Sequence, residues 1–111
     1  MDIDVVQASG VTVVAPRGDL DLATVDEIKR ALARVLDGGQ SRVVVDLGGV
    51  GFIDSSGMGA MVAAMKQARA AGGDLRFCGL QNDVRDIFEL TRLARAISIH
   101  PTRQEALASW R

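Results

Sequence analysis

The sequence has few of the residues that build disulfides, zinc sites and nucleophilic catalytic centres. Its 111 residues include one cysteine, Cys78, and one histidine, His100. A disulfide needs a second cysteine, and a structural zinc site usually takes about four cysteine or histidine ligands. A serine nucleophile needs a base beside it, and we expect His100 to lie in a loop at a strand end. The chain therefore lacks the residues for an internal disulfide, a zinc site of its own or a serine-hydrolase triad.

Long apolar runs and a strong excess of one charge are also missing. No stretch free of charged residues approaches the roughly 18 apolar residues that a membrane span requires, and Asp2 and Asp4 interrupt any signal peptide at the N-terminus. Lys and Arg number 13 against 14 Asp and Glu, a net charge of -1, whereas nucleic-acid binding favours a basic surface. We therefore expect a cytoplasmic protein that enters no membrane and binds no nucleic acid.

What is present is typical of one globular domain. Hydrophobic residues make up 48% of the chain and charged residues 24%, close to the average for soluble domains. A chain of this length buries about two thirds of its unfolded surface, which suffices for one core. We expect residues 1–111 to form a single domain, and the balanced charge requires nothing beyond a monomer or weak dimer.

Apolar periodicity predicts an alternation of strands and helices. Two β-branched runs, 3–8 and 11–16, flank Ser9-Gly10 and predict a β-hairpin. Capping-box pairs, Thr24 with Glu27 and Thr102 with Glu105, predict the starts of the first and last helices. The expected helices are 24–36, 55–71, 82–91 and 102–110, and the strands after the hairpin are 43–47, 75–78 and 97–99.

This order predicts an α/β fold. Strands that alternate with helices imply right-handed crossovers and a mostly parallel sheet. The hairpin adds one antiparallel pair, and the almost continuous apolar run at 43–47 is typical of a central strand covered on both faces. We expect a mixed, mostly parallel sheet opened by a β-hairpin, with about four helices.

The segment 46–59 is the most informative part of the chain. A buried strand leads through glycines to Ser55 and Ser56 at the start of a helix, and Gly57 and Gly59 follow in its first turns. Glycine inside a helix costs about 1 kcal/mol relative to alanine, which indicates a close approach to that backbone, by a partner or by packing. Asp54 and both serines are also good N-cap residues, so helix capping alone is an open alternative.

Two further chemistries are considered for this end of the sheet. Gly57 and Gly59 begin a dinucleotide fingerprint, but Val62 occupies its third small position and no acid follows near Cys78 to bind a ribose. Four carboxylates lie at or just beyond the C-terminal ends of strands and could together bind a magnesium ion, although solvated acids in loops are commoner. These carboxylates are Asp19, Asp21, Asp46 and Asp54. We expect no metal ion and no cofactor.

The whole chain resembles the STAS domain, and within it the small bacterial anti-sigma factor antagonists of sporulation and stress response. Residues 18–21 resemble the family's Gly-acid-Leu-Asp turn, and 46–59 resemble its phosphorylation loop, in which Asp, Ser, Ser or Thr, and Gly follow one another. Weaker matches are 90–93 with 97–99, a helix-to-strand turn, and 105–107, in the closing helix.

The resemblance implies a non-enzymatic partner switch. The unmodified protein would bind an anti-sigma factor that is also a serine kinase, and so free the sigma factor. Phosphorylation on Ser56, with Ser55 as a secondary acceptor, would end the binding, and a metal-dependent phosphatase would reverse it. The residues expected to bind the partner are Asp19, Asp21, Asp54, Ser55, Ser56, Gly57, Met58 and Gly59. The alternative is a STAS module of a stressosome-like scaffold or of a lipid or anion transport complex.

Overall fold

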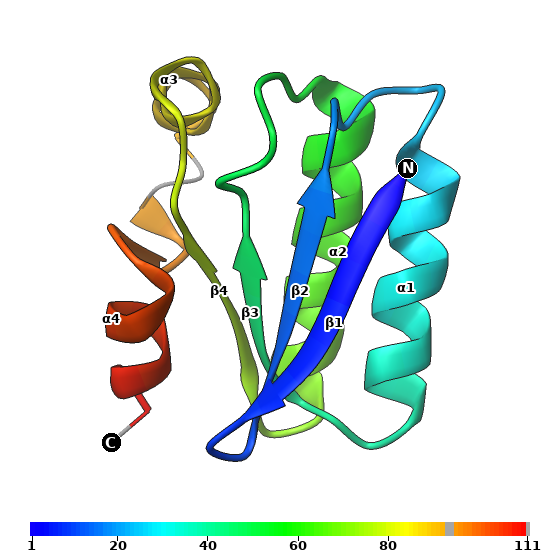
Figure 1. The fold of residues 1–111 in the computed structure, drawn as a ribbon, viewed down its shortest axis with the longest axis vertical. Coiled ribbons are helices and arrows are strands. Elements are labelled where there is room, and N and C mark those ends of the chain that lie inside the picture. Colours follow the sequence, from blue (N-terminus) through cyan, green and yellow to red (C-terminus); the bar gives the residue numbers. More distant parts are fainter. Residues whose placement is uncertain (93–94, 111) are drawn as a thin grey trace.

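The computed structural model describes residues 1–92 and 95–110 and has the α/β architecture that the sequence predicts (Figure 1). One five-stranded sheet has the strand order β1-β2-β3-β4-β5, with β1 antiparallel to β2 and the remaining pairs parallel. The strands are β1 (Asp2–Ala8), β2 (Val11–Arg17), β3 (Arg42–Asp46), β4 (Asp74–Cys78) and β5 (Ile99–His100), and the helices are α1 (Val25–Asp37), α2 (Ser55–Ala70), α3 (Asn82–Leu90) and α4 (Arg103–Ala108).

The predicted hairpin is confirmed, and its turn explains its register. Ser9 and Gly10 both have positive φ, 54° and 79°, the backbone that a two-residue turn between twisted strands requires. Ala8 therefore pairs with Val11, and the register continues to Asp2 opposite Arg17.

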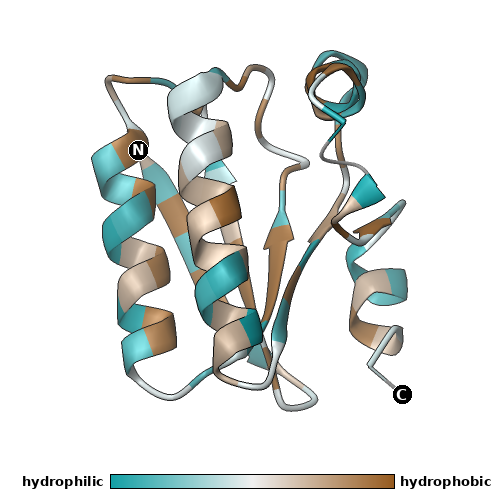
Figure 2. Cartoon of the chain, turned by 180° about the vertical axis from the view of Figure 1, so that it is seen from behind, coloured by the Kyte–Doolittle hydropathy of each residue, from teal (hydrophilic) through white to brown (hydrophobic). Residues whose placement is uncertain are grey.

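Both faces of the sheet are covered, as the apolar run in β3 predicts. Val43 and Val45 join the larger core beneath α1 and α2, whereas Val44 points to the opposite face, where it clusters with residues of α4. Figure 2 shows α1 and α2 side by side on the first face, and the buried residues of both helices are almost all apolar. The first turns of α2 are pale in that view, because small and weakly polar residues occupy them.

Both predicted helix starts are confirmed, but only one of them has the expected capping bond. At α4 the Thr102 hydroxyl accepts a hydrogen bond from the Glu105 amide at 3.1 Å, as expected. At α1 Thr24 is the N-cap residue, as predicted, but its hydroxyl makes no capping bond and donates instead to the Asp19 carbonyl at 2.6 Å. The Glu27 carboxylate accepts from the N-terminal amine of Met1 at 3.0 Å. The loop before the helix and the N-terminus of the chain thus engage the two residues of the predicted capping box.

The last strand also differs from the prediction. It spans Ile99–His100 rather than 97–99, since Ile99 pairs with Phe77 and His100 with Cys78. His100 is therefore a strand residue and not a loop residue. The last helix ends at Ala108, two residues before the predicted end. Leu93, which closes one of the family-like stretches, lies outside the described residues. In the part of the chain that the structure describes, no helix is long and apolar enough to cross a bilayer.

Candidate functional site

The candidate site lies where the loops after β2 and β3 meet the start of α2. Beyond the strands, the two loops continue to pair: the Gly18 amide donates to the Gly49 carbonyl at 3.0 Å and the Leu20 amide to the Phe52 carbonyl at 2.9 Å. The Asp54 amide returns a bond to the Leu20 carbonyl at 3.0 Å. These three hydrogen bonds, which we call the loop zipper, hold the loop that carries Asp19 and Asp21 beside the start of α2. The sequence predicts this placement, because both loops follow the carboxyl ends of strands.

Asp46 does not belong to this group. One of its carboxylate oxygens accepts from the Gly48 amide at 2.9 Å, and the other pairs with Arg103 of α4 at 3.0 Å. It therefore fastens α4 to the end of β3. Among the described residues no three His, Cys, Asp or Glu side chains are grouped so that they could hold a metal ion.

Asp54 is the N-cap of α2. Its Oδ1 accepts from the Gly57 amide at 3.0 Å, and its Oδ2 accepts from the Leu22 amide at 3.1 Å. The Gly57 bond is the largest cause of a lowered Asp54 pKa; desolvation opposes it, and the Leu22 amide and the amide and hydroxyl of Ser56 add to the lowering. The carboxylate thus caps the helix and ties it to the loop after β2.

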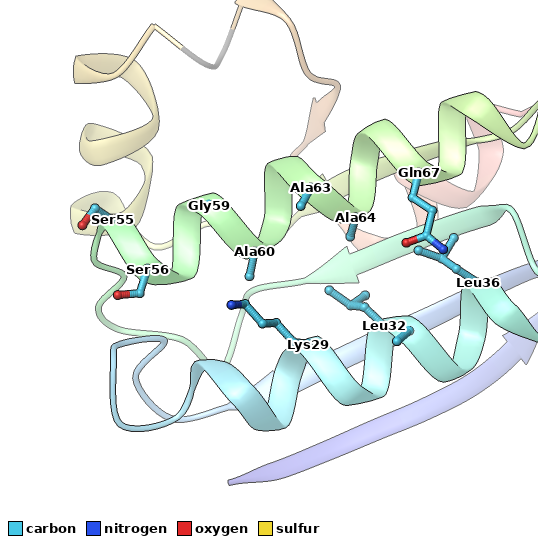
Figure 3. A pocket seen from close by; sticks show the side chains of 11 residues that line it. Lys29, Leu32, Leu36, Ser55, Ser56, Gly59, Ala60, Ala63, Ala64 and Gln67 are labelled. Atoms are coloured by element: carbon cyan, nitrogen blue, oxygen red, sulfur yellow. The ribbon is translucent and has the colours of Figure 1, made fainter.

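The cap assignment settles where the two serines lie. With Asp54 as the N-cap, Ser55 and Ser56 are the first residues inside the helix and neither is its cap. Figure 3 shows the Ser56 side chain on the side of α2 that faces α1, whereas the Ser55 side chain points away from α1. Ser55 is exposed and Ser56 is partly buried. The two hydroxyls are therefore presented in different directions from the same helix start.

Ser56 lies at one end of a groove between α1 and α2, with a volume of about 330 Å³. Small residues form the α2 side of this groove, which we call the α1–α2 groove. Lys29, Leu32 and Leu36 of α1 line the opposite side. The lining residues of α2 are Ser55, Ser56, Gly59, Ala60, Ala63, Ala64 and Gln67.

The two glycines of the helix start have different roles. A Cβ at Gly57 would lie 2.7 Å from the Leu20 carbonyl oxygen and 2.8 Å from Cγ1 of Ile53. A Cβ at Gly59 would meet no atom within 4 Å. The close approach expected at both glycines is therefore an internal contact at Gly57, and only Gly59 leaves open space at the surface.

Two of the residues expected to bind a partner are not on the surface. Gly57 is buried, and Met58 is 5% exposed and packs in the core. Helix geometry turns both residues inward, so the exposed surface at this helix start is formed by their neighbours, which Gly57 and Met58 support from beneath.

Two exposed apolar side chains at this end were missed from the sequence. Leu22 is 78% exposed, and its amide binds Asp54; Phe52 is 46% exposed, two residues before Asp54. The signal available in the sequence was a large apolar residue in each of two loops, but exposure depends on how the loops pair. The site surface, as we define it, comprises Asp19, Asp21, Leu22, Phe52, Ser55, Ser56 and Gly59.

Comparisons with known proteins agree with this architecture. Over its full length the chain is 28% identical to a protein of Bordetella bronchiseptica named "Putative anti-sigma factor antagonist BtrV", and the match covers 96% of that protein. It is 25% identical over 108 residues to the anti-sigma F factor antagonist of Paenibacillus polymyxa, which covers 96% of this chain and 92% of the relative.

A solved structure gives the same result. The crystal structure of an anti-sigma factor antagonist from Mycobacterium paratuberculosis superposes with a TM-score of 0.90 and 25% identity, over 97% of this chain and 92% of that one. The names of these relatives describe proteins that antagonise anti-sigma factors. The family model of the STAS domain matches residues 2–106, and the chain therefore belongs to the STAS domain family, with anti-sigma factor antagonists among its relatives.

Proposed function

We propose that this chain, acting as one domain over residues 1–111, is the antagonist in a phosphorylation-controlled partner switch. In its unmodified form it binds an anti-sigma factor that is also a serine kinase, and the sigma factor is released. The kinase phosphorylates Ser56, which ends the binding, and a metal-dependent phosphatase removes the phosphate. The observation that carries the proposal is the position of Ser56 inside an accessible helix start whose cap is supplied by Asp54.

The helix start suits a serine that gains and loses a phosphate. Phosphorylation adds about -1.5 to -2 charges and three acceptor oxygens. A helix N-terminus favours negative charge, since its first amides have no partner within the helix. The fold should therefore tolerate the modification, with the Asp54 cap and the loop zipper in place.

The partner would tolerate the modification far less. The partner's surface packs against the neutral hydroxyls of this chain, next to the carboxylates of Asp19 and Asp21. A phosphate on Ser56 would bring additional negative charge and bulk into this contact, from which water is excluded. Juxtaposed like charges in such a contact cost several kcal/mol. Each 1.4 kcal/mol weakens the dissociation constant tenfold, so this is enough to switch the complex off.

The apolar part of the site surface would supply affinity. Leu22 and Phe52 expose large side chains at 78% and 46%, and interface energy is concentrated in a few apolar or aromatic contacts surrounded by polar ones.

Gly59 leaves open space beside Ser56, so a kinase active site could approach the hydroxyl closely. We place this exchange in the cytoplasm, where sigma factors act.

The test is affinity capture from a lysate of the source organism with three baits: wild type, Ser56→Asp and Ser55→Asp. Asp is well accommodated in the first turn of a helix, so both variants should fold. We expect an anti-sigma factor of the kinase type, identified by its mass, on wild type and its loss from Ser56→Asp. The Ser55→Asp bait places the same charge one residue earlier in the helix, so comparing it with Ser56→Asp shows which of the two serines controls the binding. Equal retention of the same proteins on wild type and Ser56→Asp would overturn the proposal.

A further inference from the structure

We propose that Lys29 is the counter-ion of the phosphate on Ser56, so that phosphorylation creates an ion pair between α1 and α2. This rests on the proposed function for the origin of the phosphate. Lys29 and Ser56 come from different helices, yet both line the α1–α2 groove. The rest of the groove is apolar or neutral, with leucines on α1 and mainly Gly59 and alanines on α2.

The Lys29 side chain extends from α1 into the same groove that Ser56 lines. In Figure 3 the Lys29 side chain reaches across the groove from α1, and its amino group lies beneath Ala60 of α2. Ala60 is four residues after Ser56, and residues four apart in a helix are neighbours on one face. A phosphate on Ser56 extends beyond the hydroxyl, and the long, flexible lysine stem needs only to swing by one helical turn to meet it.

The charges around Ser56 make this lysine important. Carboxylates occur in the segments around the helix start: Asp19 and Asp21 lie in the loop after β2, Asp26 in the first turn of α1, and Asp54 is the cap. Asp54 is engaged by the amides of Gly57 and Leu22, but it remains a negative charge beside the phosphoserine. Of the described residues that line the groove, Lys29 alone carries a positive charge.

Lys29 would affect partner binding in both the unmodified and the phosphorylated protein. In the unmodified protein the Lys29 side chain is exposed in the groove, where a partner can reach its charge. After phosphorylation the same ammonium is held by the phosphate across the end of the groove. The partner can then no longer pair with the Lys29 ammonium, and the ion pair blocks the end of the α1–α2 groove. Both effects add to the new negative charge on Ser56.

The test measures the phosphate directly. Phosphoserine is installed at position 56 of the full chain by genetic-code expansion, and its second ionisation is followed by phosphorus NMR as a function of pH. A nearby cation stabilises the dianion and lowers its pKa. We expect Lys29→Met to raise the phosphate pKa by roughly half a pH unit, the effect of a partly exposed ion pair, and Lys29→Arg to retain the wild-type value.

The matched control is Lys66→Met. Lys66 is an exposed lysine of α2, ten residues after Ser56 and so about 15 Å away along the helix, and its removal should leave the phosphate pKa unchanged. The proposal is overturned if Lys29→Met leaves the pKa at the wild-type value, or if Lys66→Met raises it equally. Because the phosphoserine is installed without a kinase, this result is independent of the lysate capture, and a failure of the proposed switch would appear there alone.

Discussion

The two glycines at the start of α2 should respond to alanine in opposite directions. Alanine at Gly57 would place its Cβ 2.7 Å from the Leu20 carbonyl oxygen. That oxygen cannot simply move aside, because it also accepts the hydrogen bond from the Asp54 amide at 3.0 Å. Relief of the clash requires a shift of the loop zipper or of α2 itself.

The size of the effect follows from two competing terms. Replacing glycine by alanine in a helix gains about 1 kcal/mol, whereas forcing an additional methyl group into a packed site costs about 1–3 kcal/mol or more. With a rigid carbonyl as the obstacle, we expect Gly57→Ala to lower the free energy of unfolding by about 2 kcal/mol net. Gly59→Ala meets no atom within 4 Å, so it should gain close to the full helix term, about 1 kcal/mol.

Urea unfolding followed by circular dichroism measures both variants against wild type. The expected gap between them is about 3 kcal/mol, which in a domain of this size corresponds to well over 10 °C in Tm. The reasoning is refuted if the two variants have the same free energy of unfolding, or if Gly59→Ala is the less stable one. Gly59→Ala also tests the open space at the surface, because it should weaken kinase binding while stabilising the fold.

Three further predictions concern other parts of the molecule. Leu22→Ser should weaken binding of the anti-sigma factor about tenfold, as loss of an interface anchor does, with unchanged Tm because the side chain is 78% exposed; calorimetric titration checks the first and thermal unfolding the second. The lowered pKa of Asp54 means that its ionised form stabilises the fold above the unfolded value of about 3.9 and that this stabilisation is lost as the pH falls through the folded pKa. Wild-type stability should therefore decline more steeply than that of Asp54→Asn below about pH 4, and parallel curves would contradict this assignment. Burial raises the pKa of the Cys78 thiol to about 12, so a disulfide reagent at pH 8 should label it only as fast as the fold opens; immediate labelling of the native protein would show otherwise.

The order of elements was predictable because it depends on local patterns. The turn residues Ser9 and Gly10 specify the hairpin by their positive φ, and the apolar run of β3 indicates burial on both faces. Both features are encoded by residues close together in the chain, and the structure confirms both.

The details of the site were less predictable because they depend on contacts between distant segments. Thr24 and Thr102 carry the same local signature, yet only the Thr102 hydroxyl makes the capping bond. At α1 the Glu27 carboxylate binds the amine of Met1, 26 residues away, and the Thr24 hydroxyl donates to the loop before the helix. The requirement for glycine at position 57 comes from Leu20, which is far away in the chain. Likewise, the exposure of Leu22 and Phe52 follows from the pairing of two loops, which no window of sequence contains.

The most direct test of the switch is the affinity of the purified kinase-type anti-sigma factor for two forms of this chain, unmodified and carrying phosphoserine at position 56. Isothermal titration calorimetry measures both dissociation constants under the same buffer conditions. The account predicts that the phosphate weakens binding at least about 100-fold, the equivalent of about 2.7 kcal/mol. Dissociation constants that agree within about a factor of two would contradict the central claim that Ser56 controls the choice of partner.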